Sequence, residues 1–170
     1  RPALLGIGFS VPERDSLLAL AEHSGGTIAA FTGPGGGEVL RLHDPDGVPV
    51  DVLYGQAKVP TLPSRGIIVH NAPAQMVRVN DAQRPPLAPP DVRKLGHLVL
   101  TSPNFPRKVQ WYMSMFGFIP SDVLCLPDGT PAGAFLRLDR GVTPTDHHTL
   151  FVVIGPGADI DHVAFEVTAL

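Results

Sequence analysis

The sequence predicts an α+β fold built from a repeated unit of one strand, one helix and further strands. Segments with strand and helix patterning return in the same order about ninety residues later. The 170 residues include 18 glycines and 19 prolines, which require many turns and leave little room for long helices. With 44% hydrophobic residues, the chain can still form a hydrophobic core.

The first unit begins with the short apolar run Leu4 to Val11, which predicts a strand. A helix is expected from Pro12 to about Ser24, because proline is tolerated in the first turn of a helix. Glu38 to His43 and Val48 to Tyr54 are strand-like, and Asp44-Pro45-Asp46-Gly47 between them is a turn sequence. These two segments therefore predict a hairpin.

The second unit repeats this order. Leu95 to Leu100 predicts a strand, and Asn104 to Phe116 predicts a helix with apolar residues at helical spacing. Ala134 to Leu138 and His148 to Ile154 predict further strands. Asp161 to Phe165 resembles the first strand of each unit, so a third copy is expected to begin there.

A proline-rich segment separates the two units. The prolines between Pro60 and Arg93 disfavour a helix and favour an extended connection, in which Ile67 to Val69 could add an edge strand. We therefore divide the chain into a module at 1–59, a linker at 60–94, and at 95–170 a second module followed by the first strand of the next.

Composition excludes several classes of protein. Thirteen Lys and Arg against sixteen Asp and Glu give a net charge of −3, which does not favour a nucleic-acid or membrane-surface partner. No apolar run approaches the roughly 20 residues of a membrane-spanning helix. The single cysteine, Cys125, cannot form an intramolecular disulfide, so a reducing cytoplasm is expected.

Histidines are the main functional signal. His97 and His162 occupy equivalent places near the start of a first strand, so their imidazoles converge if the repeats pack about a pseudo-twofold axis. Neutral imidazole is a ready ligand for a divalent transition metal. The alternative is that each is an ordinary strand histidine with a hydrogen-bonded ring.

The His147-His148 pair adds a candidate for proton transfer. If both residues lie in a strand, their side chains point to opposite faces, so only one can face a shared site. We expect His148 to line the site, where a histidine next to a metal suits proton transfer near neutral pH. His147 is then expected to turn away.

Other motifs carry less chemistry. Two histidines usually need a carboxylate to complete a ferrous site. Glu166 is four residues from His162 along a strand, about 13 Å at roughly 3.3 Å per residue, so we interpret it as structural. Asp51 is a weaker candidate ligand.

Gly33 to Gly37 is not followed by Lys-Ser/Thr, as a phosphate-binding loop would be, and is interpreted as a turn. No Gly-x-Ser-x-Gly sequence supports a hydrolase.

Five motifs together resemble a known family. They are Gly96-His97-Leu98-Val99-Leu100, Trp111-Tyr112 through Phe116-Gly117-Phe118 and Ser121-Asp122, Phe135 to Gly141, Asp146 to Leu150, and Asp161 to Val167. In this order they resemble the vicinal oxygen chelate superfamily, and within it the type I extradiol ring-cleaving dioxygenases. The resemblance covers about the last 75 residues and implies βαβββ modules that form open, curved mixed sheets around a metal and ligand cavity.

The resemblance implies a role for each candidate residue. His97 and His162 are the implied ligands of Fe(II), or of Mn(II), and His148 is the implied acid/base residue. Val99 and Phe135 are the implied substrate-pocket walls. The implied reaction cleaves a catechol-type ring with O2 in aromatic hydrocarbon catabolism. We further expect a cytoplasmic homo-oligomer.

The resemblance also implies parts that the sequence does not contain. Its third ligand, a glutamate, is expected beyond Leu170, and residues 1–59 resemble the second module of a non-catalytic N-terminal domain. We therefore expect an interior portion of a dioxygenase that is inactive and free of iron by itself. We also expect a partner chain, or disordered following residues, at the strand of residues 161–168.

Two other functions fit the same fold. One is a non-catalytic binding protein similar to bleomycin-resistance proteins, which sequesters a small molecule. The other is a glyoxalase-like isomerase or epimerase, which would need metal-binding carboxylates that the sequence does not supply.

Overall fold

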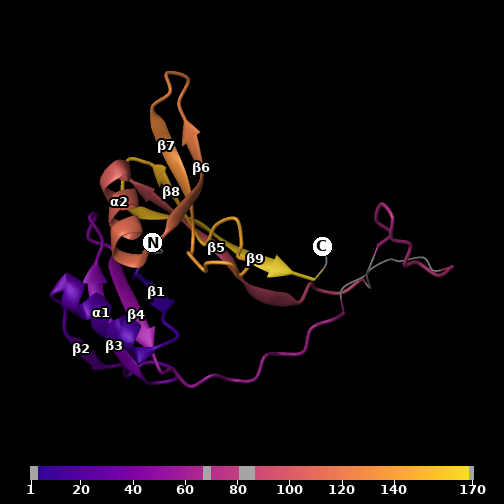
Figure 1. Cartoon of the computed structure of the whole chain (residues 1–170), viewed down its shortest axis with the longest axis horizontal. Coiled ribbons are helices and arrows are strands. Elements are labelled where there is room, and N and C mark those ends of the chain that lie inside the picture. The colour runs from indigo at the N-terminus through magenta and orange to yellow at the C-terminus, as the bar shows by residue number, and fades with distance from the viewer. Residues whose placement is uncertain (1–3, 67–69, 81–86, 169–170) are drawn as a thin grey trace. The chain divides into compact units, whose positions relative to one another are not determined.

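The computed structural model describes residues 4–66, 70–80 and 87–168. It is an α+β protein with two mixed, open sheets, so the predicted fold class is confirmed (Figure 1). The chain forms two compact units. One comprises Arg1–Val59 and His97–Val163, and the other comprises Pro60–Gly96 and Ala164–Leu170. Both repeats therefore contribute to the first unit, and the division into modules at 1–59 and 95–170 stays a proposal.

The first repeat forms a four-stranded sheet with the order β1-β4-β3-β2. Strand β1 pairs parallel with β4, whereas β3 is antiparallel to both β4 and β2. The elements are β1 (Ile7–Ser10), α1 (Arg14–Ser24), β2 (Ile28–Ala30), β3 (Glu38–His43) and β4 (Pro49–Tyr54). The predicted helix is confirmed, and Gly25 ends it in the left-handed conformation with φ 67°.

The predicted hairpin between β3 and β4 is also confirmed. His43 pairs with Pro49 and Glu38 with Tyr54. Asp44 closes the turn, because its Oδ1 accepts hydrogen bonds from the backbone N–H groups of Asp46 and Val48 at 2.9 and 3.0 Å. The buried Asp44 is thus part of the turn's own geometry.

The second repeat forms a five-stranded sheet with the order β6-β7-β8-β5-β9. Its elements are β5 (Val92–Ser102), α2 (Phe105–Phe116), β6 (Ile119–Cys125), β7 (Pro131–Arg137), β8 (Leu150–Ile154) and β9 (Asp159–Val167). The helix and the strands β5, β7, β8 and β9 fall at predicted places. Strand β6 is not among the predicted strands, because its polar residues and irregular register obscure the period-two pattern.

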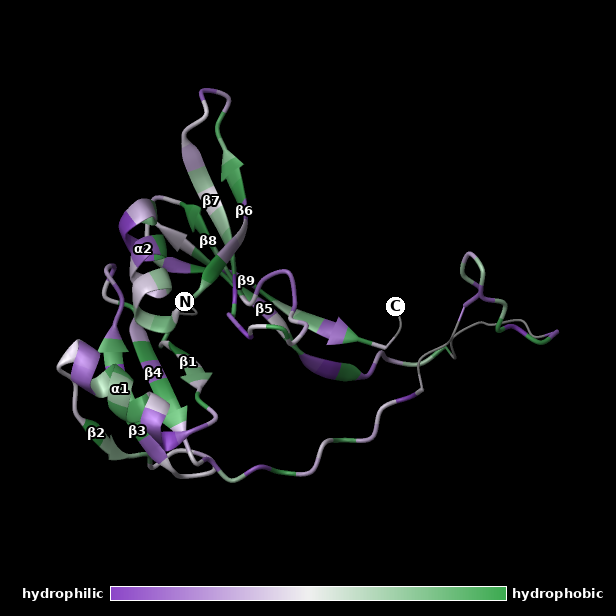
Figure 2. Ribbon diagram, viewed as in Figure 1, coloured by the Kyte–Doolittle hydropathy of each residue, from purple (hydrophilic) through white to green (hydrophobic). Residues whose placement is uncertain are grey.

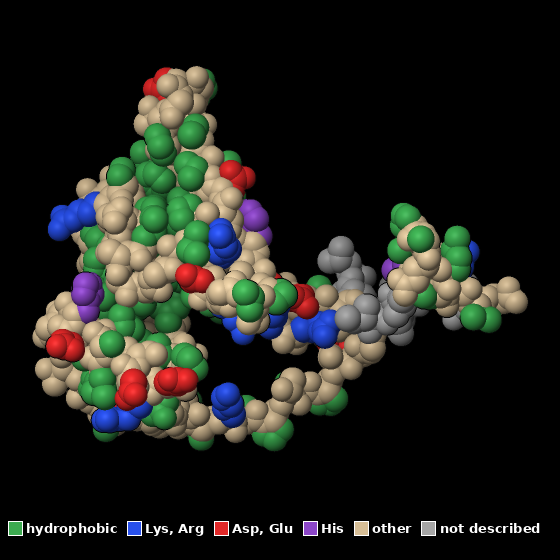
Figure 3. Space-filling model, in the orientation of Figure 1, with side chains coloured by type: hydrophobic (Ala, Val, Ile, Leu, Met, Phe, Trp, Pro, Cys, Tyr) green, Lys and Arg blue, Asp and Glu red, His purple; other side chains and the backbone are tan. Residues whose placement is uncertain are grey.

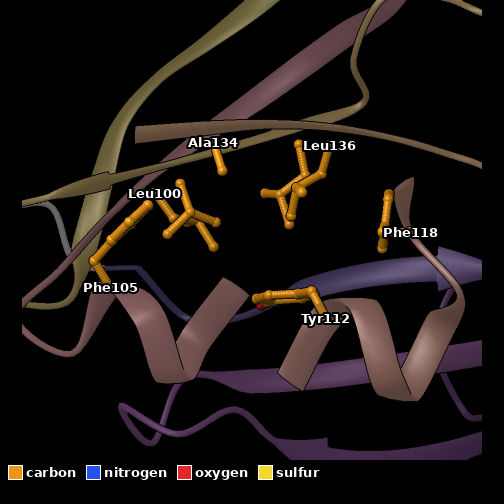
Figure 4. Packing of buried hydrophobic residues seen from close by; sticks show 8 residues of the cluster. Leu100, Phe105, Tyr112, Phe118, Ala134 and Leu136 are labelled. Carbon is orange, nitrogen blue, oxygen red and sulfur yellow. The ribbon is translucent and has the colours of Figure 1, made fainter. Parts of the chain in front are cut away.

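One face of the second sheet packs on α2. Leu100, Leu136 and Val152 are fully buried and join Phe105 and Tyr112 of the helix in one cluster (Figure 4). Figure 2 shows both hydrophilic and hydrophobic residues along α1 and α2, as expected of helices that cover a sheet with one side only.

The helix α2 also contacts the first repeat. Phe9 of β1 lies with its ring centroid 5.2 Å from that of Phe116 and 5.8 Å from that of Phe118. Lys108 of α2 is fully buried and forms ion pairs with Asp44 and Asp46 in the turn between β3 and β4. Aromatic packing and a buried ionic network therefore hold the two repeats in one unit.

The second compact unit contains the proline-rich segment. Its described residues before β5 form no helix or strand beyond an isolated bridge between Ala72 and Gln75. Arg65 pairs with Asp91 at 3.0 Å. Ile67 to Val69, suggested as an edge strand, lie outside the described residues. Strand β5 begins at Val92, within the range expected to be linker.

Apolar side chains also reach the surface. In the hairpin of β6 and β7, Val123, Leu124 and Leu126 are 42%, 47% and 46% exposed. Figure 3 shows hydrophobic side chains at the surface of the molecule. Among the described residues, no helix is both long and apolar enough to cross a membrane.

Candidate functional site

The candidate site lies on the sheet face opposite α2. Along β5, Leu98 and Leu100 belong to the core cluster, so His97, Val99 and Thr101 point to the other face. The ladders place Val99 beside Phe151, and Phe151 beside Phe135. This face therefore combines a histidine with an apolar surface.

Three imidazoles gather at this face. The ring centroid of His97 lies 4.2 Å from that of His148 and 5.6 Å from that of His162. His97 comes from β5, His162 from β9, and His148 from the loop that precedes β8. The structure thus brings together all three histidines that sequence analysis selected, although their roles in metal binding and proton transfer stay predictions.

The environment favours the neutral form of two of these rings. Burial lowers the pKa of His97, and the nearby His162 lowers it further. Burial also lowers the pKa of His148, and the nearby His97 adds to this effect. A neutral imidazole has a free lone pair, so both rings are suited to bind a metal or to accept a proton at neutral pH.

The expectation that His147 turns away from the site is wrong. His147 Nδ1 lies 3.1 Å from His148 Nδ1, and both rings lie near Phe135, with centroids 5.4 and 4.9 Å from that of the phenyl ring. Strand β8 begins at Leu150, so the two histidines lie in the preceding loop. The rule of alternating faces does not apply there, because it requires extended strand backbone.

The predicted wall residues lie beside the histidines. Phe135 stacks on Phe151 with centroids 4.1 Å apart and an interplanar angle of 10°. Val99 is only 2% exposed, so it supports the face rather than presenting much surface of its own. Phe151 was not among the predicted site residues, because its place opposite Phe135 depends on the register between β7 and β8, which the sequence does not give.

Among the described residues, no three His, Cys, Asp or Glu side chains form a group placed to hold a metal ion, and no carboxylate completes the histidine cluster. Asp51 lies 3.8 Å from Arg41 on the first sheet, and Glu166 lies 3.4 Å from Lys94, in agreement with its structural interpretation. Asp161 Oδ2 is 2.7 Å from His162 Nδ1, on a half-exposed pair of side chains. This carboxylate therefore orients a ring and leaves Nε2 of His162 available to a ligand.

Known proteins resemble the chain in structure. No family model matches it, and no curated protein matches it. It is 26% identical to the Mn(II)-bound glyoxalase from Novosphingobium aromaticivorans, with a TM-score of 0.60, over 94% of this chain and 45% of that one.

Two dioxygenases share the fold at lower identity. One is homoprotocatechuate 2,3-dioxygenase from Brevibacterium fuscum in complex with 3,4-dihydroxyphenylacetate, at 21% identity and a TM-score of 0.63, over 97% of this chain and 47% of that one. The other is a halotolerant catechol dioxygenase, at 23% identity and a TM-score of 0.59, over 95% of this chain and 50% of that one. The chain spans half or less of the length of these three solved structures.

Proposed function

We propose that this chain, which has the fold of the vicinal oxygen chelate superfamily, comes from a metal-dependent extradiol dioxygenase that cleaves a catechol-type ring with O2. The observation that supports this proposal most is the convergence of His97, His148 and His162 beside Phe135 on one sheet face. The dioxygenases that share the fold add support.

We assign His97 and His162 as ligands of Fe(II), with Mn(II) as the alternative ion. Metal–nitrogen bonds of about 2.1 Å put each ring centroid about 3.3 Å from a shared ion, so two such centroids can be up to about 6.6 Å apart. The observed 5.6 Å fits this limit. A bound Fe(II) would supply Lewis-acid and redox chemistry. A carboxylate ligand would have to come from outside the described residues.

We assign His148 as the acid/base residue. Its ring lies next to His97, and its lowered pKa leaves it neutral and able to accept a proton at a ring nitrogen. We assign Phe135 and Val99 to the wall of the substrate pocket, where Phe135 would contact the substrate ring and the buried Val99 would support the wall from behind. The proposed protein works in the cytoplasm as a homo-oligomer, and its substrate is a small aromatic diol.

The test compares variants of the full-length protein. Mn(II) binding, followed by electron paramagnetic resonance, should be lost in His97→Ala and retained in Asp51→Asn, whose carboxylate lies on the other sheet. After reconstitution with Fe(II), ring cleavage of catechol should fall about 10²- to 10⁴-fold in His148→Ala, with the metal still bound. Unchanged Mn(II) affinity in His97→Ala would contradict the ligand assignment.

A second candidate reaction is favoured by the similarity to the Mn(II)-bound glyoxalase. The same full-length protein should then isomerise a hemithioacetal without consuming O2. An oxygen electrode separates the two reactions, because ring cleavage consumes one O2 for each catechol. A protein that binds catechol but catalyses neither reaction would support the binding-protein alternative.

A further inference from the structure

Strand β6 contains an irregularity next to the candidate site. Pro120 pairs with Leu136, and Asp122 pairs with the adjacent Phe135, so Ser121 is an extra residue without a partner on β7. Such a bulge changes the direction of a side chain, and bulges are common beside functional sites.

The hydroxyl of Ser121 links two elements. Ser121 Oγ donates a hydrogen bond to the backbone carbonyl of His147 at 2.5 Å. Arg137 Nη1 donates to the same Ser121 Oγ at 3.0 Å and to the carbonyl of Pro120 at 3.0 Å. Because a serine hydroxyl has one proton, accepting from Arg137 directs that proton to His147.

The hydrogen bond from Ser121 to His147 fixes the residue directly before His148. On the other side of His148, Thr149 N–H donates to the carbonyl of Leu136 at 2.9 Å, and its carbonyl accepts from Leu98 N–H at 3.1 Å. His148 is therefore held between two anchored residues, although it lies in the loop between β7 and β8. Of these three contacts, the Ser121 contact alone uses a side chain, so substitution can remove it selectively.

We propose that Ser121, supported by Arg137, is a positioning residue that holds His148 against His97. This inference rests on the proposed function of His148. The bulge turns the hydroxyl toward the loop, the hydroxyl holds the peptide before His148, and the imidazole is thereby kept at the 4.2 Å ring separation from His97. Acid/base catalysis depends on this placement, because proton transfer requires the ring within hydrogen-bonding reach of the substrate.

The experiment uses the full-length protein with three substitutions. Ser121→Ala removes the hydroxyl, and Ser121→Thr retains it. Ser114→Ala is the matched control, because Ser114 Oγ also donates to a backbone carbonyl, that of Trp111, but on an exposed turn of α2. Hydrogen exchange of the peptide covering residues 139–150 reports the loop, and kcat and KM for catechol report the site.

In Ser121→Ala, loop exchange should accelerate and kcat should fall, each by about threefold to tenfold, the effect of one hydrogen bond. KM should stay within about twofold, because Phe135 and Val99 are unchanged. Ser121→Thr and Ser114→Ala should both behave as the wild type. If the loop of Ser121→Ala exchanges hydrogen at the wild-type rate, Ser121 does not hold it and the inference is overturned. The inference is also overturned if exchange accelerates but kcat is unchanged. If the wild-type protein does not cleave catechol, the proposed function is refuted. The hydrogen-exchange rate of Ser121→Ala would still test whether Ser121 holds the loop.

Discussion

Lys108 Nζ lies 2.9 Å from Asp44 Oδ2, and neither side chain has any solvent exposure. The ammonium group is also 3.0 Å from Asp46 Oδ2, and Tyr112 O–H donates to Asp44 Oδ2 at 3.2 Å. Two carboxylates of one turn thus meet one cation on α2. This network ties the helix beneath the candidate site to the hairpin of the first repeat.

Removing the cation should destabilise the chain strongly. Lys108→Met leaves two buried carboxylates without a counter-charge, so the free energy of unfolding should fall by about 3 to 5 kcal/mol. Urea denaturation measures this loss. Arg107→Ala, an exposed position on the same helix, should change the free energy by less than about 0.5 kcal/mol. Equal effects of the two substitutions would contradict a structural role for the network.

The network should also make stability depend on pH. Burial alone would raise the pKa of Asp46, but hydrogen bonds from Ser102 and Lys108 outweigh it and lower the pKa. A lowered pKa contributes stability above the unfolded value of about 3.9, and this contribution is lost as pH falls through the folded value. The stability difference between wild type and Asp46→Asn should therefore shrink below about pH 4 in urea titrations. A difference independent of pH would argue against this linkage.

The site histidines should titrate in a characteristic way. In metal-free protein, NMR of the ring protons should give His97 a pKa below its usual 6.5, because burial and the nearby His162 disfavour its charged form. In His162→Ala this pKa should rise only partly, since burial is the larger cause and remains. His43→Ala, on the first sheet, should leave the His97 pKa unchanged. A complete return to 6.5 in His162→Ala would show that His162, and not burial, is the dominant cause of the lowered pKa.

Two neighbouring glycines should differ in their tolerance of a side chain. Both Gly36 and Gly37 have positive φ, at 60° and 98°. A Cβ at Gly37 would clash with the carbonyl oxygen of Tyr54, whereas at Gly36 it would meet nothing within 4 Å. Thermal unfolding should therefore show a loss of about 2 to 4 kcal/mol for Gly37→Ala but only about 1 kcal/mol for Gly36→Ala. Similar losses would mean that the turn can relax around Tyr54.

Local patterns determined much of the fold. The ends of α1 and α2 follow from Gly25 and Gly117, both of which adopt the left-handed conformation that glycine permits. The turn Asp44 to Gly47 carries its own hydrogen bonds, so the hairpin register follows from adjacent residues. The repeat also indicated that His97 and His162 would converge, because equivalent strands occupy equivalent places.

Only the tertiary structure decided the rest. Lys108 is a residue type that is usually exposed, and it is buried because Asp44 and Asp46, far away in the sequence, meet it. The bulge at Ser121 depends on pairing with β7, and the loop before Leu150 places His147 and His148 outside strand alternation. Local periodicity reports the backbone state of neighbouring residues. Burial, loop contacts and the register between strands outside the hairpin of β3 and β4 depend on partners that only the folded chain brings together.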